Sequence, residues 1–386
     1  MYHWCPGSYW PNKISEKRLL LAPLKKVRDL FSYRHGFHAG NHADVLKHTV
    51  FLAVLDYFQQ KDAGLWVIDT HAGAGLYDLR GEWANKKEEY LEGIGRLWQG
   101  QGLPPMIARY VKAIEELNTS GELALYPGSP WLALMSLRSQ DRLKLFELMN
   151  AEFSVLQKNL SQQGHLPPRV LQSQQSDGFA ALKALLPPAS RRAVTLIDPP
   201  YEDKQDYRHV LQAVKEAIKR FPTGTYLIWY PRVNRLEAQQ LPRRLGQLPV
   251  PWLDVEMTVC KPPTDSHGLF GSGMFVINPP FTLEESLRKT MPWLTKKLAT
   301  DSTARWELST SAGIPKVTAR AGAGTTTAAR STARNVTKTA GQSETKDAVR
   351  SPARSPARGP ARGPARGPAR SPARGSNRGP TKVSSE

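Results

Sequence analysis

Short apolar runs alternate with longer amphipathic stretches along residues 30–300. Amphipathic stretches such as Asp206–Arg220 predict helices, and the alternation predicts an α/β domain with a mostly parallel, doubly wound sheet. No helical pattern separates the last two apolar runs, so we expect them to form an antiparallel hairpin at the edge of the sheet. Seven runs are five to seven residues long and have the composition of buried strands: Leu65–Asp69, Leu143–Leu148, Arg169–Gln174, Ala193–Asp198, Thr225–Tyr230, Leu253–Val259 and Met274–Asn278.

The first predicted strand runs into a turn that contains two glycines, Asp69-Thr70-His71-Ala72-Gly73-Ala74-Gly75. Glycine permits a tight turn and a close approach of the backbone to a ligand. A dinucleotide-binding loop would carry a third Gly or Ala at position 78, where this chain has Asp78. The loop therefore favours S-adenosylmethionine, which has no pyrophosphate to bind, over a nicotinamide or flavin cofactor.

The cofactor ribose needs an acid at the end of the second strand, and Glu147 is the best candidate. In dinucleotide folds this acid follows the loop by about 20 residues, so this chain has an insertion of roughly 50 residues. Helical patterns at Glu88–Trp98 and Met106–Leu117 predict that the insertion, at about residues 78–125, is a small helical subdomain. Asp177-Gly178 follow the third strand, where an acid can accept the amine of the cofactor's adenine.

The fourth predicted strand ends in Asp198-Pro199-Pro200-Tyr201, the tetrad typical of enzymes that methylate the exocyclic amine of adenine or cytosine. Two prolines cannot continue a strand, so the chain leaves the sheet at its carboxyl edge, where ligands bind in such folds. The lone pair of an exocyclic amine is delocalised into the ring. We expect Asp198 to accept one N–H and localise that lone pair, the Pro199 carbonyl to accept the other, and Tyr201 to stack on the base.

A second sequence, Asn278-Pro279-Pro280-Phe281, also matches the broad form of this tetrad. Asn278 cannot accept a proton, and it closes the seventh predicted strand rather than the fourth. Strand order therefore favours Asp198 as the catalytic residue. The remaining alternative for either tetrad is a Pro-Pro stop to a strand without any chemistry.

The formal net charge of +19 is concentrated at the ends of the chain. Residues 1–29 carry six Lys/Arg against two acids, and residues 311–386 carry fifteen against three, which favours a polyanionic partner. The two cysteines, Cys5 and Cys260, give neither a disulfide framework nor a metal-ligand spacing. No apolar run is long enough for a membrane span or a secretory signal, so we expect a cytoplasmic protein.

From Ser311 the composition is reduced to Ala, Gly, Pro, Ser, Thr and Arg, and residues 351–374 repeat Ser-Pro-Ala-Arg or Gly-Pro-Ala-Arg. Such a segment cannot bury a core, which predicts disorder. We therefore divide the chain into an N-terminal extension or mis-assigned start (residues 1–29), a catalytic domain (residues 30–300) and a disordered basic tail (residues 301–386).

Taken together, the motifs resemble the RlmJ-type family of 23S ribosomal RNA adenine-N6 methyltransferases over about residues 30–300. The resemblance implies a Rossmann-like class I fold that uses S-adenosylmethionine. The histidine-rich run is the most specific motif; its composition alone would suggest a metal site, but the resemblance implies none. The matching segments are Ser32-Tyr33-Arg34-His35, residues 38–48, the Asp69–Gly75 loop, Tyr126-Pro127-Gly128-Ser129-Pro130, Asp177-Gly178, the Asp198 tetrad and Trp229-Tyr230-Pro231.

The resemblance also implies roles for single residues. Asp198 would be the catalytic residue, and Tyr33 and Lys47 would face the RNA or the reacting base. The substrate would be 23S ribosomal RNA before full assembly of the ribosome. After Glu147 the family often has Leu-His-Pro, where this chain has Leu148-Met149-Asn150. The implied cofactor contacts are His48, His71, Ser129, Glu147, Asp177, Gly178 and Asp198.

Two other functions are compatible with the residues. The tetrad alone does not separate RNA from DNA adenine methylation, although no DNA target-recognition domain follows the core. A protein without catalytic activity could instead bind nucleic acid through its basic tail.

The tail predicts electrostatic tethering to RNA, because it adds twelve net positive charges to the chain. Removing residues 311–386 should flatten the dependence of RNA affinity on salt, measured as the slope of log K against log salt concentration. An unchanged slope would show that the tail is dispensable for RNA binding.

Overall fold

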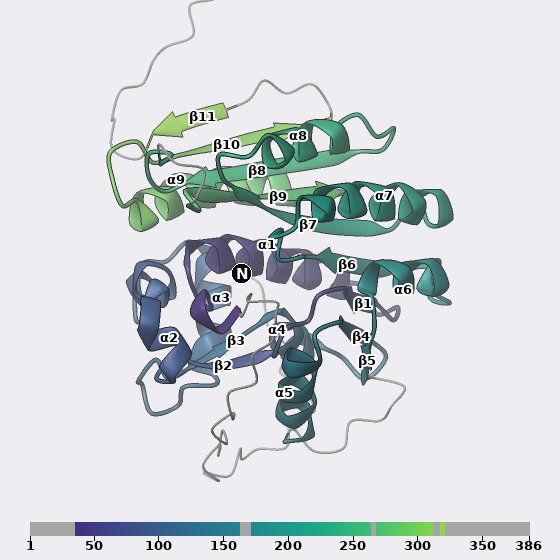
Figure 1. The fold of residues 1–386 in the computed structure, drawn as a ribbon, viewed down its shortest axis with the longest axis horizontal. Helices are drawn as coiled ribbons and strands as arrows, with labels where there is room; N and C mark the ends of the chain where they lie inside the picture. Colours follow the sequence, from purple (N-terminus) through teal and green to yellow (C-terminus); the bar gives the residue numbers. More distant parts are fainter. Residues whose placement is uncertain (1–34, 163–170, 264–267, 312–316, 321–386) are drawn as a thin grey trace, which may run out of the picture. The chain divides into compact units, whose positions relative to one another are not determined.

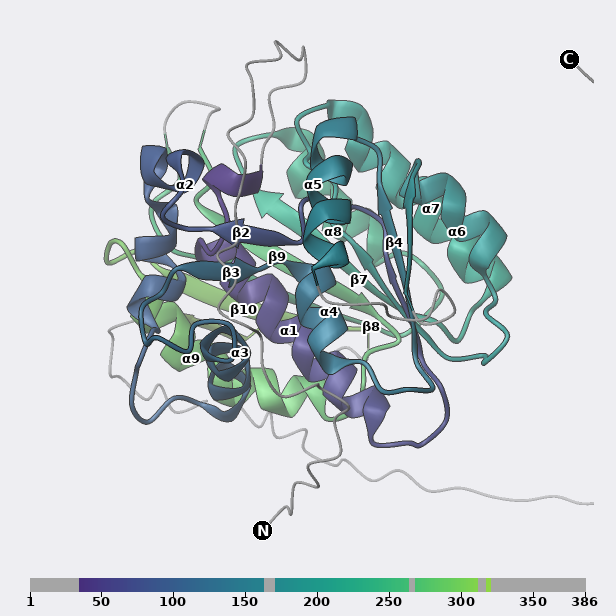
Figure 2. The ribbon, with the colours of Figure 1, turned by 90° about the horizontal axis from the view of Figure 1, so that it is seen from below.

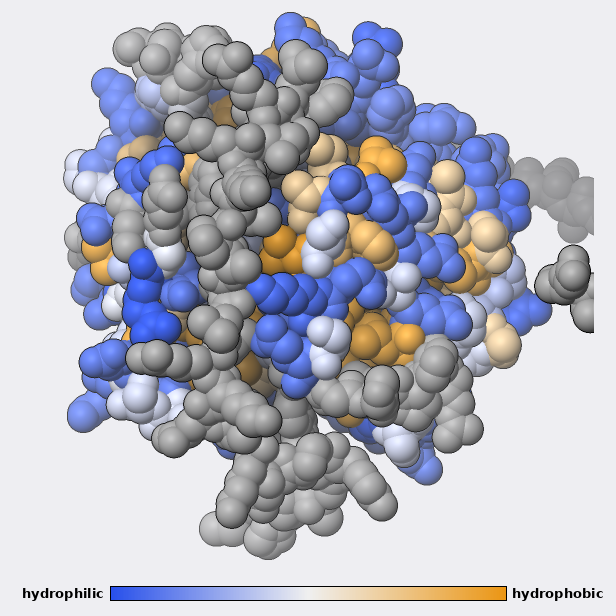
Figure 3. All heavy atoms as spheres, turned by 60° about the horizontal axis from the view of Figure 1, so that its bottom comes forward, coloured by the Kyte–Doolittle hydropathy of each residue, from blue (hydrophilic) through white to orange (hydrophobic). Residues whose placement is uncertain are grey.

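The computed structural model describes residues 35–162, 171–263, 268–311 and 317–320. The predicted N-terminal extension, Tyr33 and the repeats of the tail lie outside these residues. Within the described part, none of the helices is long and apolar enough to cross a lipid bilayer. On the face drawn in Figure 3, apolar patches alternate with hydrophilic residues.

The main sheet has the order β11-β10-β8-β9-β7-β6-β1-β4-β5 (Figure 1). All seven predicted strands are present, and β7, β6, β1, β4 and β5 are parallel neighbours. Because the chain runs outward from β1 in both directions, the strand order reverses between β1 and β6, which is where such sheets bind ligands. The bounds are β1 (Trp66–Asp69), β4 (Arg142–Glu147), β5 (Leu171–Gln175), β6 (Ala193–Ile197), β7 (Thr225–Arg232), β8 (Trp252–Thr258), β9 (Gly271–Ile277), β10 (Arg305–Thr310) and β11 (Val317–Arg320).

The prediction of seven strands was wrong at one edge of the sheet. β8 and β9 form the expected antiparallel hairpin, but β10 pairs with β8, and β11 pairs with β10. The sheet therefore continues past residue 300, where we placed the end of the catalytic domain. Trp306 and Leu308 of β10 are buried in the main core. β10 lies just before the change in composition at Ser311 and alternates Trp306 and Leu308 with polar residues, so it does not form an apolar run like the predicted strands.

Helices cover both faces of the sheet and enclose two hydrophobic cores (Figures 1 and 2). Strand side chains alternate between the cores: Val194 and Leu196 of β6 face one, and Ala193 and Ile197 face the other. One face carries α1 (His42–Gln59), α3 (Pro105–Glu115), α4 (Ser129–Ser136), α5 (Asn150–Ser161) and α9 (Leu283–Leu298), and the other carries α6 (Gly178–Leu185), α7 (Lys204–Arg220) and α8 (Leu236–Leu245).

Helix α1 begins in the histidine-rich motif, and twelve of its eighteen residues are buried. It follows a 3-10 turn, η1 (His35–Phe37), and the side chain of Asn41 caps its first turn by accepting hydrogen bonds from the backbone N–H groups of Ala43 and Asp44. Because α1 packs against α3, α4 and β9, its polar residues Asp44, Lys47 and His48 are buried as well. Their burial requires partners, which the functional site supplies.

The insertion after β1 is bounded by a small antiparallel sheet of β2 (Leu76–Asp78) and β3 (Leu125–Pro127). The predicted helix Met106–Leu117 is confirmed as α3. The predicted helix Glu88–Trp98 was wrong, because α2 (Glu82–Lys87) precedes two short 3-10 turns, η2 (Glu89–Glu92) and η3 (Ile94–Arg96). The insertion packs into the main core rather than forming a separate subdomain.

Glycine at position 93 explains why that helix is interrupted. A Cβ atom there would lie 2.0 Å from the carbonyl oxygen of Gly40, closer than real Cβ atoms ever come. The next residue, Ile94, donates its backbone N–H to the same oxygen at 2.8 Å. The insertion therefore holds the backbone just before α1 in place.

We predict that β10 belongs to the cooperative unit of the fold. A chain that ends at residue 300 should lose at least about 3 kcal/mol of unfolding free energy relative to a chain that ends at residue 325, because Trp306 and Leu308 lose their burial. Urea denaturation of the two truncated proteins measures this difference. Equal midpoints would show that the fold ends at residue 300.

Candidate functional site

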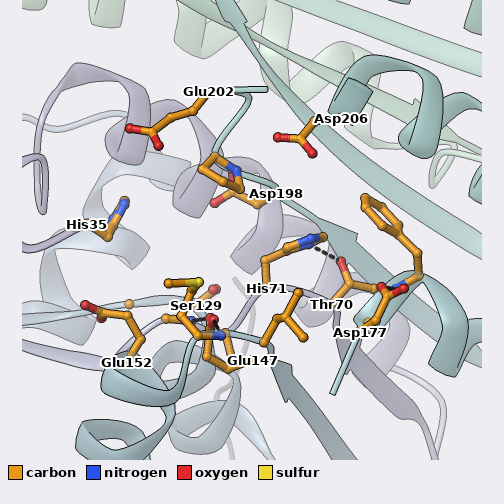
Figure 4. Close-up of a pocket in the computed structure, with 18 of the residues that line it drawn as sticks. His35, Thr70, His71, Ser129, Glu147, Glu152, Asp177, Asp198, Glu202 and Asp206 are labelled. Atoms are coloured by element: carbon orange, nitrogen blue, oxygen red, sulfur yellow. Dashed lines mark hydrogen bonds between the residues drawn. The ribbon is translucent and has the colours of Figure 1, made fainter. Parts of the chain in front are cut away.

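A cavity of about 570 Å³ opens at the carboxyl ends of β1, β4, β5 and β6 (Figure 4). In the close-up, Asp198 and Glu202 lie on one side, Ser129 and Glu147 on the opposite side, and Asp177 on a third. Eight residues named from the sequence line it: Lys47, His48, His71, Ser129, Glu147, Asp177, Gly178 and Asp198. Pro199 and Tyr201 are not among the lining residues, and Tyr33 lies outside the described part of the chain.

The glycine loop after β1 requires glycine at two positions, since Gly73 and Gly75 have φ angles of 56° and 74°. The backbone N–H of Gly73 donates to Glu147 Oε2 at 2.8 Å, and Asn159 donates to the carbonyl of Ala74 at 2.9 Å. The loop is therefore fixed from β4 and from α5 in a conformation that brings its backbone to the cavity.

Glu147 ends β4 and is held by backbone donors on both carboxylate oxygens. Oε1 accepts from Met149 at 2.7 Å, and Oε2 accepts from Gly73. Burial raises the pKa of Glu147, while these hydrogen bonds act to lower it. Each oxygen keeps further lone pairs, so this fixed carboxylate can accept hydrogen bonds from two neighbouring hydroxyl groups. The next residue, Leu148, is 62% exposed and lines the cavity.

Asp177 and Gly178 form the start of α6, opposite Glu147. The side chain of Asp177 caps α6 by accepting the N–H of Phe179 at 2.8 Å. A Cβ atom on Gly178 would lie 2.1 Å from the carbonyl oxygen of Thr70, so only glycine allows α6 to approach the loop after β1. Phe179 adds an apolar ring at this end, in edge contact with His71 at 4.8 Å between centroids.

Two histidines of the cavity, the buried His48 and the partly buried His71, carry no charge. Burial lowers the pKa of His48 to about 3 and that of His71 to about 4. His48 Nδ1 lies 2.7 Å from the hydroxyl of Tyr126, and His71 Nδ1 lies 2.8 Å from the hydroxyl of Thr70. Both rings therefore offer hydrogen-bonding groups but no positive charge at neutral pH.

Asp198 follows β6 and forms an ion pair with Lys47, whose Nζ lies 2.5 Å from its Oδ2. Lys47 is only 4% exposed, and its Nζ also lies 2.8 Å from Asp44 Oδ1. Burial acts to lower the pKa of Lys47, but Asp198 and Asp44 outweigh it and raise the pKa well above the ordinary value. Lys47 thus contacts the predicted catalytic carboxylate directly, a contact that the sequence did not predict.

Asp44 and Asp69 are buried acids to which the sequence analysis gave no role. Asp44 Oδ2 accepts from the Gly40 N–H at 2.9 Å and lies 3.0 Å from His35 Nε2, so Asp44 anchors both the start of α1 and Lys47. Its spacing of three residues from Lys47 on a helix was the available signal. Asp69 ends β1, and burial raises its pKa to about 7 although hydrogen bonds from Ser129 and the His71 backbone lower it.

The predicted stacking role of Tyr201 is not supported by its position. The ring is 3% exposed, and its hydroxyl donates to the carbonyl of Trp229 at 2.7 Å. It packs against Tyr207 and Trp229, with centroids 4.7 Å and 5.9 Å away. Tyr201 therefore fixes the chain after Asp198 from within the core, while Pro200 lines the cavity.

The second tetrad lies at the amino ends of the parallel strands, whereas the cavity lies at their carboxyl ends. β9 runs antiparallel to β7, so Ile277 at its end pairs with Tyr226 at the start of β7. The side chain of Asn278 donates to the backbone carbonyls of Pro222 and Gly224, both at 2.7 Å. Asn278 closes a loop and is remote from the cavity.

Three of the four histidines in residues 35–48 have separate partners. His35 pairs with Asp44, His38 pairs with Glu89 at 2.8 Å, and His48 contacts Tyr126. In the described ranges, no three His, Cys, Asp or Glu side chains are grouped so that they could hold a metal ion.

Comparisons with known proteins agree on one family. Residues 62–310 match the family model described as ribosomal RNA large subunit methyltransferase D, RlmJ. The chain is 46% identical to ribosomal RNA large subunit methyltransferase J of Haemophilus influenzae, over 72% of this chain and 97% of that protein. It is 45% identical to the Escherichia coli K12 protein of the same name, over 70% and 94%.

A solved structure agrees with this assignment. The crystal structure of a Legionella pneumophila protein is 35% identical, with a TM-score of 0.64, over 70% of this chain and 98% of that one. The chain therefore belongs to the RlmJ family of ribosomal RNA large subunit methyltransferases.

Proposed function

We propose that this protein transfers the methyl group of S-adenosylmethionine to the N6 amine of one adenine in 23S ribosomal RNA, with Asp198 as the acceptor for the amine. Family membership gives the coarser statement: the protein is a methyltransferase that uses S-adenosylmethionine and acts on ribosomal RNA. The single observation that carries the finer proposal is a carboxylate from an Asp-Pro-Pro-Tyr tetrad in the cavity at the strand-order switch.

The residues of the cavity fit the cofactor. Its volume of about 570 Å³ lies within the range of small-molecule sites. We assign Glu147 to the ribose hydroxyls, Asp177 to the adenine amine, and the backbone of Gly73 and its neighbours to the remaining edge. The bound cofactor supplies an electrophilic methyl group on a sulfonium ion. On this assignment the methyl group faces Asp198, on the opposite side of the cavity from Glu147.

The ion pair with Lys47 prepares Asp198 for the amine. Lys47 occupies Oδ2, and Asp44 keeps Lys47 in place. Among the described residues, Asp198 Oδ1 has no hydrogen-bond donor, so it is available to one N–H of the adenine. Accepting that N–H localises the nitrogen lone pair toward the methyl group and gives the proton a destination after transfer. The main contribution is alignment of the two reacting groups.

Fewer contacts support the assignments on the substrate side of the cavity. The carbonyl of Pro199 remains our candidate for the second N–H of the amine. Because Tyr201 is buried, we assign it to holding the tetrad rather than to stacking. A role for Tyr33 at the RNA, and action before full ribosome assembly, remain predictions from the family resemblance.

Replacing Asp198 with Asn keeps the shape of the side chain but removes its charge, and it should lower methyl transfer at least about 100-fold. Cofactor affinity should change far less, since most assigned cofactor contacts are elsewhere. The assay is transfer of labelled methyl to 23S ribosomal RNA that lacks the modification, next to DNA of the same sequence.

The matched control is Glu216→Gln, which also removes one carboxylate, from an ion pair on α7 outside the cavity. This variant should retain full activity. Equal labelling by wild type and Asp198→Asn would refute the catalytic assignment, and preferential labelling of the DNA would refute the RNA substrate.

A further inference from the structure

Two histidines of the cavity are each bonded through Nδ1 to a hydroxyl group that has a second partner. His48 contacts Tyr126, whose hydroxyl lies 2.9 Å from that of Tyr110. His71 contacts Thr70, whose hydroxyl also bonds the carbonyl of Leu196 at 3.0 Å. A neutral imidazole carries one proton, and its position decides whether the nitrogen that remains free donates or accepts.

The proton of His48 can be placed by following the chain of hydroxyls from its far end. Tyr110 is fully buried, and within the described residues its hydroxyl has no hydrogen-bond partner except Tyr126. A buried hydroxyl proton needs an acceptor, so Tyr110 donates to Tyr126. Tyr126 must then give its own proton to His48 Nδ1, and the ring proton of His48 lies on Nε2. Burial raises the pKa of both tyrosines well above the ordinary value, so both hydroxyls keep their protons.

The same reasoning gives the opposite result for His71. The carbonyl of Leu196 can only accept, so the single hydroxyl proton of Thr70 is donated to it. Thr70 Oγ1 then accepts from His71 Nδ1–H. The ring proton of His71 is used within the protein, and Nε2 is left as an acceptor.

We propose that Tyr110 and Tyr126 are positioning residues that hold His48 as an Nε2–H donor to the carboxylate of the cofactor's amino-acid end, while Thr70 holds His71 in the opposite tautomer. This inference rests on the proposed function, because it takes the cavity to be the S-adenosylmethionine site. Tyr110 lies on α3 and Tyr126 on β3, so the insertion acts on the cofactor without lining this part of the cavity.

The charges around the cavity explain why the carboxylate needs a neutral donor. Lys47 is the only lysine or arginine among the described lining residues, and both Asp44 and Asp198 occupy it. The remaining assigned carboxylates, Glu147 and Asp177, accept hydrogen bonds from the cofactor and cannot donate. His48 lies next to Lys47 on α1 and lines the cavity, so its Nε2–H can bind the one anionic group of the cofactor.

The tautomers can be read directly from long-range ¹H–¹⁵N spectra of the full chain with ¹⁵N-labelled histidine. Signals are assigned with His48→Gln and His71→Gln variants. We expect the pattern of an Nε2–H tautomer for His48 and of an Nδ1–H tautomer for His71, without added ligand. Tyr126→Phe should mix the tautomers of His48 and leave His71 unchanged. An Nδ1–H tautomer of His48, or an Nε2–H tautomer of His71, in the wild-type protein would overturn the proposal.

Binding tests the role of the carboxylate. Tyr126→Phe should raise the Kd for S-adenosylhomocysteine about fivefold, the usual effect of losing one hydrogen bond, and should leave the Kd for the decarboxylated analogue unchanged. Tyr226→Phe is the matched control, since Tyr226 is also a buried tyrosine but bonds only backbone carbonyls of Ala217 and Phe221. It should change neither affinity.

Equal losses for both ligands, or no loss for either, would overturn the role of the carboxylate. Failure of the wild-type protein to bind S-adenosylhomocysteine at all would instead count against the proposed function. The histidine spectra of the free protein would still decide the tautomers.

Discussion

The buried ion pair between Lys47 and Asp198 joins the N-terminal motif to the carboxyl edge of the parallel strands. Lys47 comes from α1 and Asp198 from the end of β6, so the pair fixes α1 against the strand that carries the tetrad. Burying a lysine is costly unless opposite charges surround it, and removing one partner leaves an uncompensated charge. Asp44 supplies the second carboxylate, and the Trp229 ring lies 5.7 Å from the ammonium. This cluster links the proposed catalytic residue to a motif 151 residues earlier in the chain.

The cavity contains two kinds of polar group, charged side chains at the tetrad and neutral histidines. At the tetrad, charge is concentrated: Lys47 and two carboxylates stabilise one another, and Asp198 keeps one oxygen for the substrate. The two histidines of the cavity are neutral because burial lowers the pKa of both, to about 3 for His48 and about 4 for His71. The hydroxyl group bonded to each Nδ1 then determines whether the Nε2 atom of that ring donates or accepts a hydrogen bond. On the proposed assignment, the cationic cofactor is held mainly by carboxylates and neutral donors.

Much of the fold could be predicted from the sequence. All seven apolar runs are strands, because buried parallel strands leave a strong local signal. Strand order also separated Asp198 from Asn278, which the structure places at opposite edges. β10 was missed because its pairing with β8 is non-local. The interrupted helix at Glu88–Trp98 depended on contact between Gly93 and Gly40, which no local pattern reveals.

For the site as well, contacts between residues far apart in the sequence could not be predicted. Strand ends were enough to name Glu147, Asp177 and Asp198, but not their partners. The family resemblance, rather than the local pattern, added Lys47, His48, His71 and Ser129. Lys47 was assigned to the substrate, whereas its contacts are Asp198 and Asp44. The burial of Tyr201 could not be foreseen, because the same aromatic residue after Pro-Pro is compatible with a stacking face or with a core anchor. The hydroxyl chain from Tyr110 to His48 joins three elements that are separate in sequence.

The central claim is that the carboxylate held by Lys47 directs methylation to an exocyclic amine. Mass-spectrometric mapping of nucleosides from unmodified 23S ribosomal RNA, after reaction with the purified protein, tests it most directly. The account predicts a single new modification, N6-methyladenosine, at up to one methyl group per RNA molecule. A methyl group on a ring carbon, a ring nitrogen or a ribose hydroxyl would contradict it.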